Sequence, residues 1–186
     1  MTAGASATRQ GTELDLAFSS ERAFRAWYDA ALPRVYGFVL AHAAGDRELT
    51  EEITQQTFID ALRDHARFDG RSDVVTWLCA IARHKLADHY RQLDRQERRR
   101  LRLVVRELSE GGETSAWSAA EDRAEVEAAL RTLPAMQRAA LVSFYVDGLS
   151  MREIGRLVGR TETAVESLLT RARTNFRRAF READDG

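Results

Sequence analysis

The chain has 186 residues, of which 44% are hydrophobic and 31% charged, and its formal net charge is −1. This length and composition suit one medium or two small globular domains with highly charged surfaces. No apolar run reaches the length of a membrane span, the first residues lack a signal-peptide pattern, and Cys79 is the only cysteine, so we expect a cytoplasmic protein with no membrane insertion and no intrachain disulfide.

Helical periodicity dominates the first half of the chain, and strand signals are almost absent. Apolar residues at three- and four-residue steps predict a helix over residues 21–41. Pro33 lies within it and either kinks this helix or divides it. A second helix is predicted over residues 49–64. Its inward residues are Ile53, Phe58, Ala61 and Leu62.

A third helix follows a turn at residues 68–73, where Ser72 or Asp73 can cap it. We predict this helix over residues 73–91, and the charge run after it can prolong it. Residues 110–115 have the composition of a flexible linker. The inward residues of the third helix are Val74, Trp77, Leu78, Ile81 and Leu86.

Helical periodicity resumes near Glu121 and continues through Val142, Tyr145 and Val146 to a stop at Gly148. Two short helices follow, joined by a tight break at residues 159–161. Ser150 and Glu153 have the spacing of a capping box at the start of the first, and Thr161 or Thr163 can cap the second. Two helices joined by a glycine-containing turn, the second lined outward with Thr, Ser and Arg, are typical of a DNA-binding helix-turn-helix. The ordinary alternative is a pair of amphipathic helices with solvated arginines.

The charge distribution agrees with a polyanionic partner for the C-terminal part. Residues 135–181 carry nine arginines against four acids, a net charge of +5, whereas residues 113–134 carry a net charge of −3 and residues 21–91 a net charge of −1. A basic module beside near-neutral and acidic segments indicates two kinds of partner.

At this point the residues resemble a known family, the sigma-70 superfamily in its extracytoplasmic-function (ECF) branch, which has domains 2 and 4 only. Residues 50–58 are similar to the helix by which domain 2 docks on the polymerase clamp. Residues 68–72, 76–78, 81–84 and 88–91 resemble the part that melts and reads the minus-ten element. Residues 130–134, 148–150, 153–155 and 165–173 look like domain 4, which reads the minus-thirty-five element.

The resemblance implies an all-α fold of two small helical domains joined by a flexible linker, and a sigma factor that directs promoter recognition, DNA melting and initiation. Its partners are core RNA polymerase (clamp and flap), promoter DNA and an anti-sigma factor, and no cofactor or metal is expected. The predicted segments are an N-terminal extension (1–20), domain 2 (21–91), linker (92–120), domain 4 (121–181) and an acidic tail (182–186).

The resemblance also implies site residues, carried over position by position. Polymerase docking falls on Glu51, Glu52, Gln55, Gln56 and Phe58. The minus-ten contacts fall on Phe68, Asp69, Gly70, Arg71, Ser72, Trp77, Arg83, His84, Lys85 and Arg91. The minus-thirty-five contacts fall on Arg160, Thr161, Thr163, Glu166, Ser167, Thr170, Arg171 and Arg173.

Three positions depart from the family's pattern. The family often has Asn where His84 stands, and Glu166 and Leu168 occupy positions that are frequently basic. Glu can accept a hydrogen bond from cytosine N4 in a major groove but is repelled by phosphates. Either the minus-thirty-five preference is unusual, or Arg171 and Arg173 carry most of the reading.

Two other classes of function remain as alternatives. An enzyme is disfavoured because the sequence has no phosphate-cradling glycine loop, no serine elbow and no zinc-ligand spacing; Cys79, His84 and His89 do not share a helix face. A free-standing helix-turn-helix regulator would explain residues 147–180 but not the patterns at 51–58 and 68–91.

Overall fold

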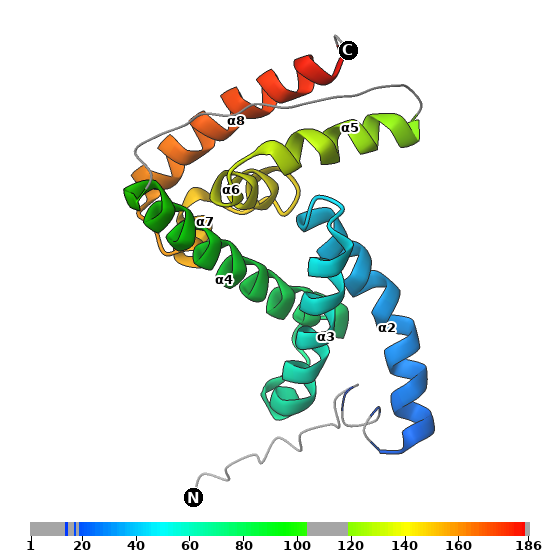
Figure 1. Ribbon diagram of the computed structural model, residues 1–186. Coiled ribbons are helices and arrows are strands. Elements are labelled where there is room, and N and C mark those ends of the chain that lie inside the picture. Colours follow the sequence, from blue (N-terminus) through cyan, green and yellow to red (C-terminus); the bar gives the residue numbers. More distant parts are fainter. Residues whose placement is uncertain (1–13, 15–16, 18, 104–118, 185–186) are drawn as a thin grey trace, which may run out of the picture. The chain divides into compact units, whose positions relative to one another are not determined.

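The computed structural model describes residues 14, 17, 19–103 and 119–184 (Figure 1). Across these residues the chain forms seven α helices and one short 3-10 helix, with no strand, which confirms the all-α prediction. The linker predicted at 110–115 lies outside the described residues. No helix in the described ranges combines the length and the apolar character needed to cross a membrane.

The chain divides into two compact units. Unit 1 comprises Met1–Val39 and Glu48–Arg83, and unit 2 comprises Leu40–Arg47 and His84–Gly186. Helix α2 (Glu21–His42) and helix α4 (Val74–Leu103) each contribute residues to both units.

Unit 1 is built from most of α2, helix α3 (Arg47–Asp64), the 3-10 helix η1 (His65–Arg67) and the start of α4. Its core is aromatic on one side: the Phe58 ring packs edge-on against Trp27, with centroids 5.7 Å apart, and lies 4.8 Å from the Tyr28 ring. Helix α2 continues through Pro33, whose side chain is exposed. The proline therefore does not divide the helix.

Unit 2 is built around helices α5 (Ala119–Thr132), α6 (Ala135–Tyr145), α7 (Met151–Val158) and α8 (Glu162–Asp184). One apolar cluster joins α6, α7 and α8, and a second joins α5, α6 and α8 with Ala44, which follows α2. The first cluster contains Met136, Ala140, Ile154, Val158, Val165, Leu168 and Leu169. The second contains Ala44, Leu130, Leu133, Val142 and Ala172.

Three apolar residues predicted by periodicity to continue a buried face lie instead at the surface. Leu62 on α3 is 40% exposed, and Tyr145 and Val146, at the end of α6, are also exposed. The helical period that placed them is correct, but each lies at the edge of its apolar stripe, where burial depends on the neighbouring helix rather than on the residue itself.

Candidate nucleic-acid interface

Helices α7 and α8 form a helix-turn-helix whose ends are set by local hydrogen bonds. Ser150 caps α7: its Oγ accepts from the backbone N–H of Glu153, and a Glu153 carboxylate oxygen accepts from the backbone N–H of Ser150 at 2.8 Å. Gly159 ends the helix with φ +68, a left-handed conformation that costs other residues more than glycine. Thr161 then caps α8, since its Oγ1 accepts from the N–H of Ala164. The predicted capping box and break are therefore present.

The capping box also shifts an acid–base equilibrium. Hydrogen bonds from the side chain and the backbone N–H of Ser150 hold the pKa of the Glu153 carboxyl below its usual value, and Arg156 adds a smaller effect in the same direction. A carboxyl with a lowered pKa in the folded state stabilises the fold at pH values above its ordinary pKa. That stabilisation is lost as the pH falls through the lowered value.

A Ser150→Ala variant tests this cap. We expect it to cost about 1 kcal/mol of unfolding free energy at neutral pH, because one free amide at the start of α7 loses its acceptor. The cost should shrink in acid, where Glu153 is protonated and its side of the box is already weakened. Urea unfolding of wild type and variant at neutral pH and near pH 3 measures the loss of unfolding free energy at each pH. An equal loss at the two pH values would show that the Glu153 carboxylate does not contribute to the cap.

The outward face of α8 carries most of the residues predicted to read DNA. Thr163, Glu166, Ser167 and Thr170 are exposed on the side of the helix opposite the buried Val165, Leu169 and Ala172. Arg171 is also exposed, and its Nε donates to the carbonyl oxygen of Ser167 at 3.3 Å. Leu168 points inward and belongs to the apolar cluster of α6, α7 and α8, so it is a packing residue.

Two predicted minus-thirty-five residues are engaged elsewhere in unit 2. The Arg173 guanidinium lies over the rings of Phe144 and Tyr145, and its Nε donates to the Tyr145 hydroxyl at 2.9 Å. The Arg160 guanidinium pairs with Asp94 of α4 at 2.7 Å. These two arginines therefore do not belong to the freely exposed face of α8.

The loop predicted to approach the minus-ten strand lies in unit 1, between η1 and α4. Asp69, Gly70, Arg71 and Ser72 are exposed, and an Asp69 carboxylate oxygen accepts from the backbone N–H of Arg71 at 3.1 Å. Phe68, in contrast, is buried, and its ring packs 5.3 Å from that of the half-buried Trp77. This packing makes Phe68 the anchor of the loop, and its contact with a base stays a prediction.

Asp73, rather than Ser72, caps α4. Its carboxylate accepts from the backbone N–H groups of Val75 and Thr76 and from the Thr76 hydroxyl. Desolvation raises the pKa of this carboxyl, but the three hydrogen bonds and the nearby Arg34 outweigh it and lower the pKa overall. Arg34 reaches this carboxylate from α2, with a nitrogen-to-oxygen distance of 3.9 Å.

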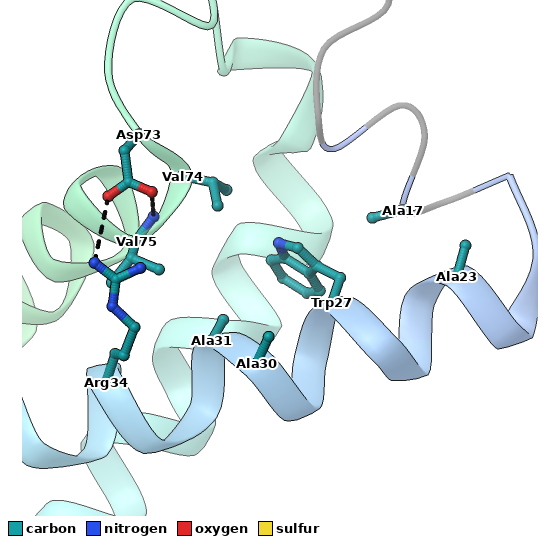
Figure 2. A pocket seen from close by; sticks show the side chains of 9 residues that line it. All are labelled: Ala17, Ala23, Trp27, Ala30, Ala31, Arg34, Asp73, Val74 and Val75. Atoms are coloured by element: carbon teal, nitrogen blue, oxygen red, sulfur yellow. Dashed lines mark hydrogen bonds and ion pairs between the residues drawn. The ribbon is translucent and has the colours of Figure 1, made fainter.

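A pocket of about 300 Å³ lies beside this cap, within unit 1. Figure 2 shows its walls: Trp27 and a series of alanines on α2, valines at the start of α4, and the Arg34–Asp73 pair at one end. The pocket is thus mainly apolar, with its charged groups already paired. The lining residues are Ala17, Ala23, Trp27, Ala30, Ala31, Arg34, Asp73, Val74 and Val75.

The basic residues predicted to contact the minus-ten strand differ in their surroundings along α4. His84 is exposed and Lys85 half-exposed. Arg83 lies over the Phe38 ring, 5.3 Å from its centroid. Arg91 donates from Nη1 to the carbonyl oxygen of Leu157 at 2.8 Å and pairs with Asp88. Arg83 and Arg91 are therefore held by other groups of the protein.

Helix α3 presents a polar face with two apolar side chains that sequence reasoning missed. Glu51, Glu52 and Gln55 are exposed, and Gln56 donates to Glu52 at 2.9 Å. Next to them along the same face lie Ile59, 45% exposed, and Leu62, 40% exposed.

Phe58, on the same helix, is buried in this structure. It is only 4% exposed and is enclosed by Trp27 and Tyr28. The inward position that periodicity predicted for Phe58 is confirmed, and its contact with polymerase stays a prediction. Across the described residues, no group of three or more His, Cys, Asp or Glu side chains is placed to hold a metal ion.

Comparison with protein-family models gives two matches in the order of the chain. The model described as sigma-70 region 2 matches residues 19–96, and the model described as sigma-70, region 4, matches residues 123–176. Together they span more than half of the chain, and the second contains the helix-turn-helix.

Individual relatives are similar over most of their length. The ECF RNA polymerase sigma factor SigC of Mycobacterium tuberculosis is 33% identical over 175 residues, which cover 93% of this chain and 92% of the relative. SigX of Bacillus subtilis, also named an ECF RNA polymerase sigma factor, is 28% identical over 160 residues, covering 79% and 78%. Among solved structures, the sigma factor RpoE of Bartonella quintana, in complex with the anti-sigma factor NepR, aligns with a TM-score of 0.53 and 19% identity over 86% of this chain and 98% of that one. That last likeness concerns the fold alone.

Proposed function

Because this chain belongs to the sigma-70 family, in its extracytoplasmic-function group, we propose that it binds core RNA polymerase and directs promoter recognition, DNA melting and initiation. One observation carries the proposal: a region 2 match and a region 4 match occur in order on one chain, and the second contains a fully capped helix-turn-helix. A free-standing helix-turn-helix regulator would account for only the second. The alternative is therefore not favoured.

Initiation by a reconstituted holoenzyme tests this function. The full chain is mixed with core RNA polymerase and fragmented genomic DNA from its own source, and the 5′ ends of the transcripts are mapped. We expect discrete start sites that share two upstream motifs and that are absent with core polymerase alone. Duplex binding without any start site that depends on the chain would favour the regulator instead.

For polymerase docking we propose the exposed face of α3. Its polar part is Glu51, Glu52, Gln55 and Gln56, as expected from the family. The exposed Ile59 and Leu62 extend it, because interfaces gain most of their affinity from apolar side chains that become buried at their centre. Phe58 supports this face from beneath.

For the minus-ten element we propose the 68–73 loop and the first turns of α4. The exposed Asp69, Gly70, Arg71 and Ser72 can approach an unpaired base, and such bases are held by stacking and edge hydrogen bonds. Phe68 and Trp77 keep the loop in place by packing on each other. Phosphate contacts are assigned to Arg83, His84 and Lys85, and to Arg91 once it is released from Leu157.

For the minus-thirty-five element we propose the outward face of α8 from Thr161 to Arg171. Hydroxyl groups at positions 163, 167 and 170 can donate to or accept from base edges, and Glu166 can accept from cytosine N4. Arg171 supplies the positive charge on this face. Arg173 acts indirectly, by fixing Tyr145 and the end of α6.

The remaining assignments follow from family membership. We propose domain 2 over residues 21–91, a linker over 92–120 that runs through the polymerase, and domain 4 over 121–181, with the flap as a second polymerase contact. The protein works in the cytoplasm, where core polymerase is, and has no catalytic activity or cofactor of its own. An anti-sigma factor is proposed as a regulatory partner, as the solved relative RpoE has one in NepR.

A further inference from the structure

Residues 150–173, which form the helix-turn-helix, contain three acidic side chains, and two of them have partners there. Glu153 belongs to the capping box with Ser150. Glu162, the first residue of α8, forms an ion pair with Arg152 at 3.7 Å. Glu166 is exposed, and among the residues that the structure describes its carboxylate has no hydrogen-bond or ion-pair partner.

Glu166 lies in the middle of the outward face of α8, between Thr163 and Thr170. In a helix-turn-helix the N-terminal residues of the second helix contact the base edges. Residues 161–170 carry two charged side chains, Glu162 and Glu166, and both are negative. The part of α8 that would enter the groove therefore lacks the positive charge that usually faces DNA.

The threonine hydroxyls that follow Glu166 along the helix use their hydrogens within α8. Thr170 Oγ1 donates to the backbone carbonyl oxygen of Glu166 at 3.0 Å, and Thr174 Oγ1 donates to that of Thr170 at 3.1 Å. Both hydroxyls therefore present lone pairs outward, and an ionised carboxylate accepts hydrogen bonds without donating any. This stretch of the face is rich in acceptors, so it matches hydrogen-bond donors.

The donors on base edges in the major groove are the amino groups of cytosine and adenine, N4 and N6. Guanine presents the acceptors N7 and O6, and thymine presents the acceptor O4, so both bases repel a carboxylate. Adenine carries the acceptor N7 beside its amino group, whereas cytosine offers N4 without a neighbouring acceptor. Of the four bases, cytosine is the best match for a carboxylate.

We propose that Glu166 is a specificity-determining residue that selects a cytosine at one position of the minus-thirty-five element and disfavours the other bases there; this rests on the proposed function, which makes α8 the reading helix. Without that cytosine, the carboxylate loses water against base acceptors and lies near phosphates with no donor in return. Discrimination of this kind works through repulsion of the wrong sequences as well as through the contact with the right one.

The test uses a promoter whose start site depends on the reconstituted holoenzyme, with its minus-thirty-five element randomised. Transcripts are sequenced for wild type, for Glu166→Gln and for the matched control Glu162→Gln. Both variants lose one negative charge from the same helix, but Glu162 is the acid that pairs with Arg152. With wild type we expect cytosine, at one position of one strand, to be favoured about tenfold over the other bases.

Glu166→Gln should change the base preference at that position alone. Glutamine donates and accepts together, as adenine N6 and N7 require, so adenine should replace cytosine there. Glu162→Gln should keep the cytosine. An unchanged cytosine preference in Glu166→Gln overturns the proposal. Equal stimulation of every sequence overturns it too, since Glu166 would then only repel phosphates, and so does a wild-type element with no preferred cytosine.

The outcome for Glu166 is separable from that for the sigma function. If no start site depends on the chain, the sigma assignment fails, and random duplexes are instead selected by retention on the immobilised full chain. A cytosine preference that Glu166→Gln removes would then support the proposal for a free-standing regulator, whereas retention without it, or no retention, would overturn it. If initiation occurs but Glu166→Gln changes no base preference, the sigma assignment stands and the proposal for Glu166 fails.

Discussion

Replacing Ile59 and Leu62 together with glutamate is expected to weaken binding of the chain to core RNA polymerase by about a hundredfold or more. Both side chains are close to half exposed on α3, and they lie on one face with Glu52 and Gln55, at helical steps of three and four residues. Exposed apolar side chains surrounded by polar ones are the usual anchors of a protein interface. Two carboxylates there would have to lose their water on docking.

The same variant should fold normally, because neither side chain is part of the core of unit 1. Its unfolding free energy should stay within about 0.5 kcal/mol of wild type. The matched control is Ile59→Leu with Leu62→Ile, which keeps the apolar surface and should bind polymerase within a few-fold of wild type. Affinity is measured by titrating labelled chain with core polymerase. Wild-type affinity in the double glutamate variant would exclude this face from docking.

The anchors of this face could not be identified from the sequence alone. Periodicity assigns Leu62 to the buried stripe of α3 because leucine is apolar and stands next to Ala61, but burial at the edge of a stripe depends on where the neighbouring helices lie. Phe58 shows the reverse case. The family resemblance gave it a docking role, while its helical position alone correctly placed it inward against Trp27.

The sequence predicted correctly those features of the fold that a few adjacent residues determine. The capping box at Ser150 and Glu153 and the break at Gly159 are encoded by local hydrogen-bonding chemistry and by the backbone freedom of glycine. Helix α4 extends to Leu103 through the charge run, as the pattern allowed. Such signals need no knowledge of the tertiary fold.

The contacts that Arg91 and Arg160 make within unit 2 are the opposite kind of feature. Arg91 and Leu157 are 66 positions apart, and so are Asp94 and Arg160; His42 and Asp147 are 105 apart. An arginine in a sequence rich in arginine gives no sign of which acid or carbonyl it will meet. The family resemblance predicted DNA contacts for Arg91 and Arg160, and the sequence did not indicate the contacts that they make within the protein.

Adding a single methyl group to the helix-turn-helix, by Gly155→Ala, is expected to cost about 2 kcal/mol of stability, in the range for overpacked sites. Gly155 is buried in the middle of α7, and a Cβ there would lie 2.7 Å from the carbonyl oxygen of Arg160. That oxygen belongs to the backbone of the turn. The backbone N–H of Arg160 in the same turn donates to the carbonyl oxygen of Gly155 at 2.8 Å. The turn must shift to admit the methyl group, so affinity for duplex DNA should fall as well.

The matched control for this variant is Gly37→Ala, in α2. A Cβ at Gly37 meets no atom within 4 Å, and alanine is favoured over glycine inside a helix by about 0.5–1 kcal/mol. The same substitution should therefore stabilise the chain at one position and destabilise it at the other, as measured by urea unfolding. If Gly155→Ala unfolded at the wild-type urea concentration and kept wild-type duplex affinity, the close approach of α7 to the turn would not be what positions α8. In the structure the carbonyl oxygen of Arg160 occupies the space that a Cβ at position 155 would need, and α8 begins two residues later at Glu162.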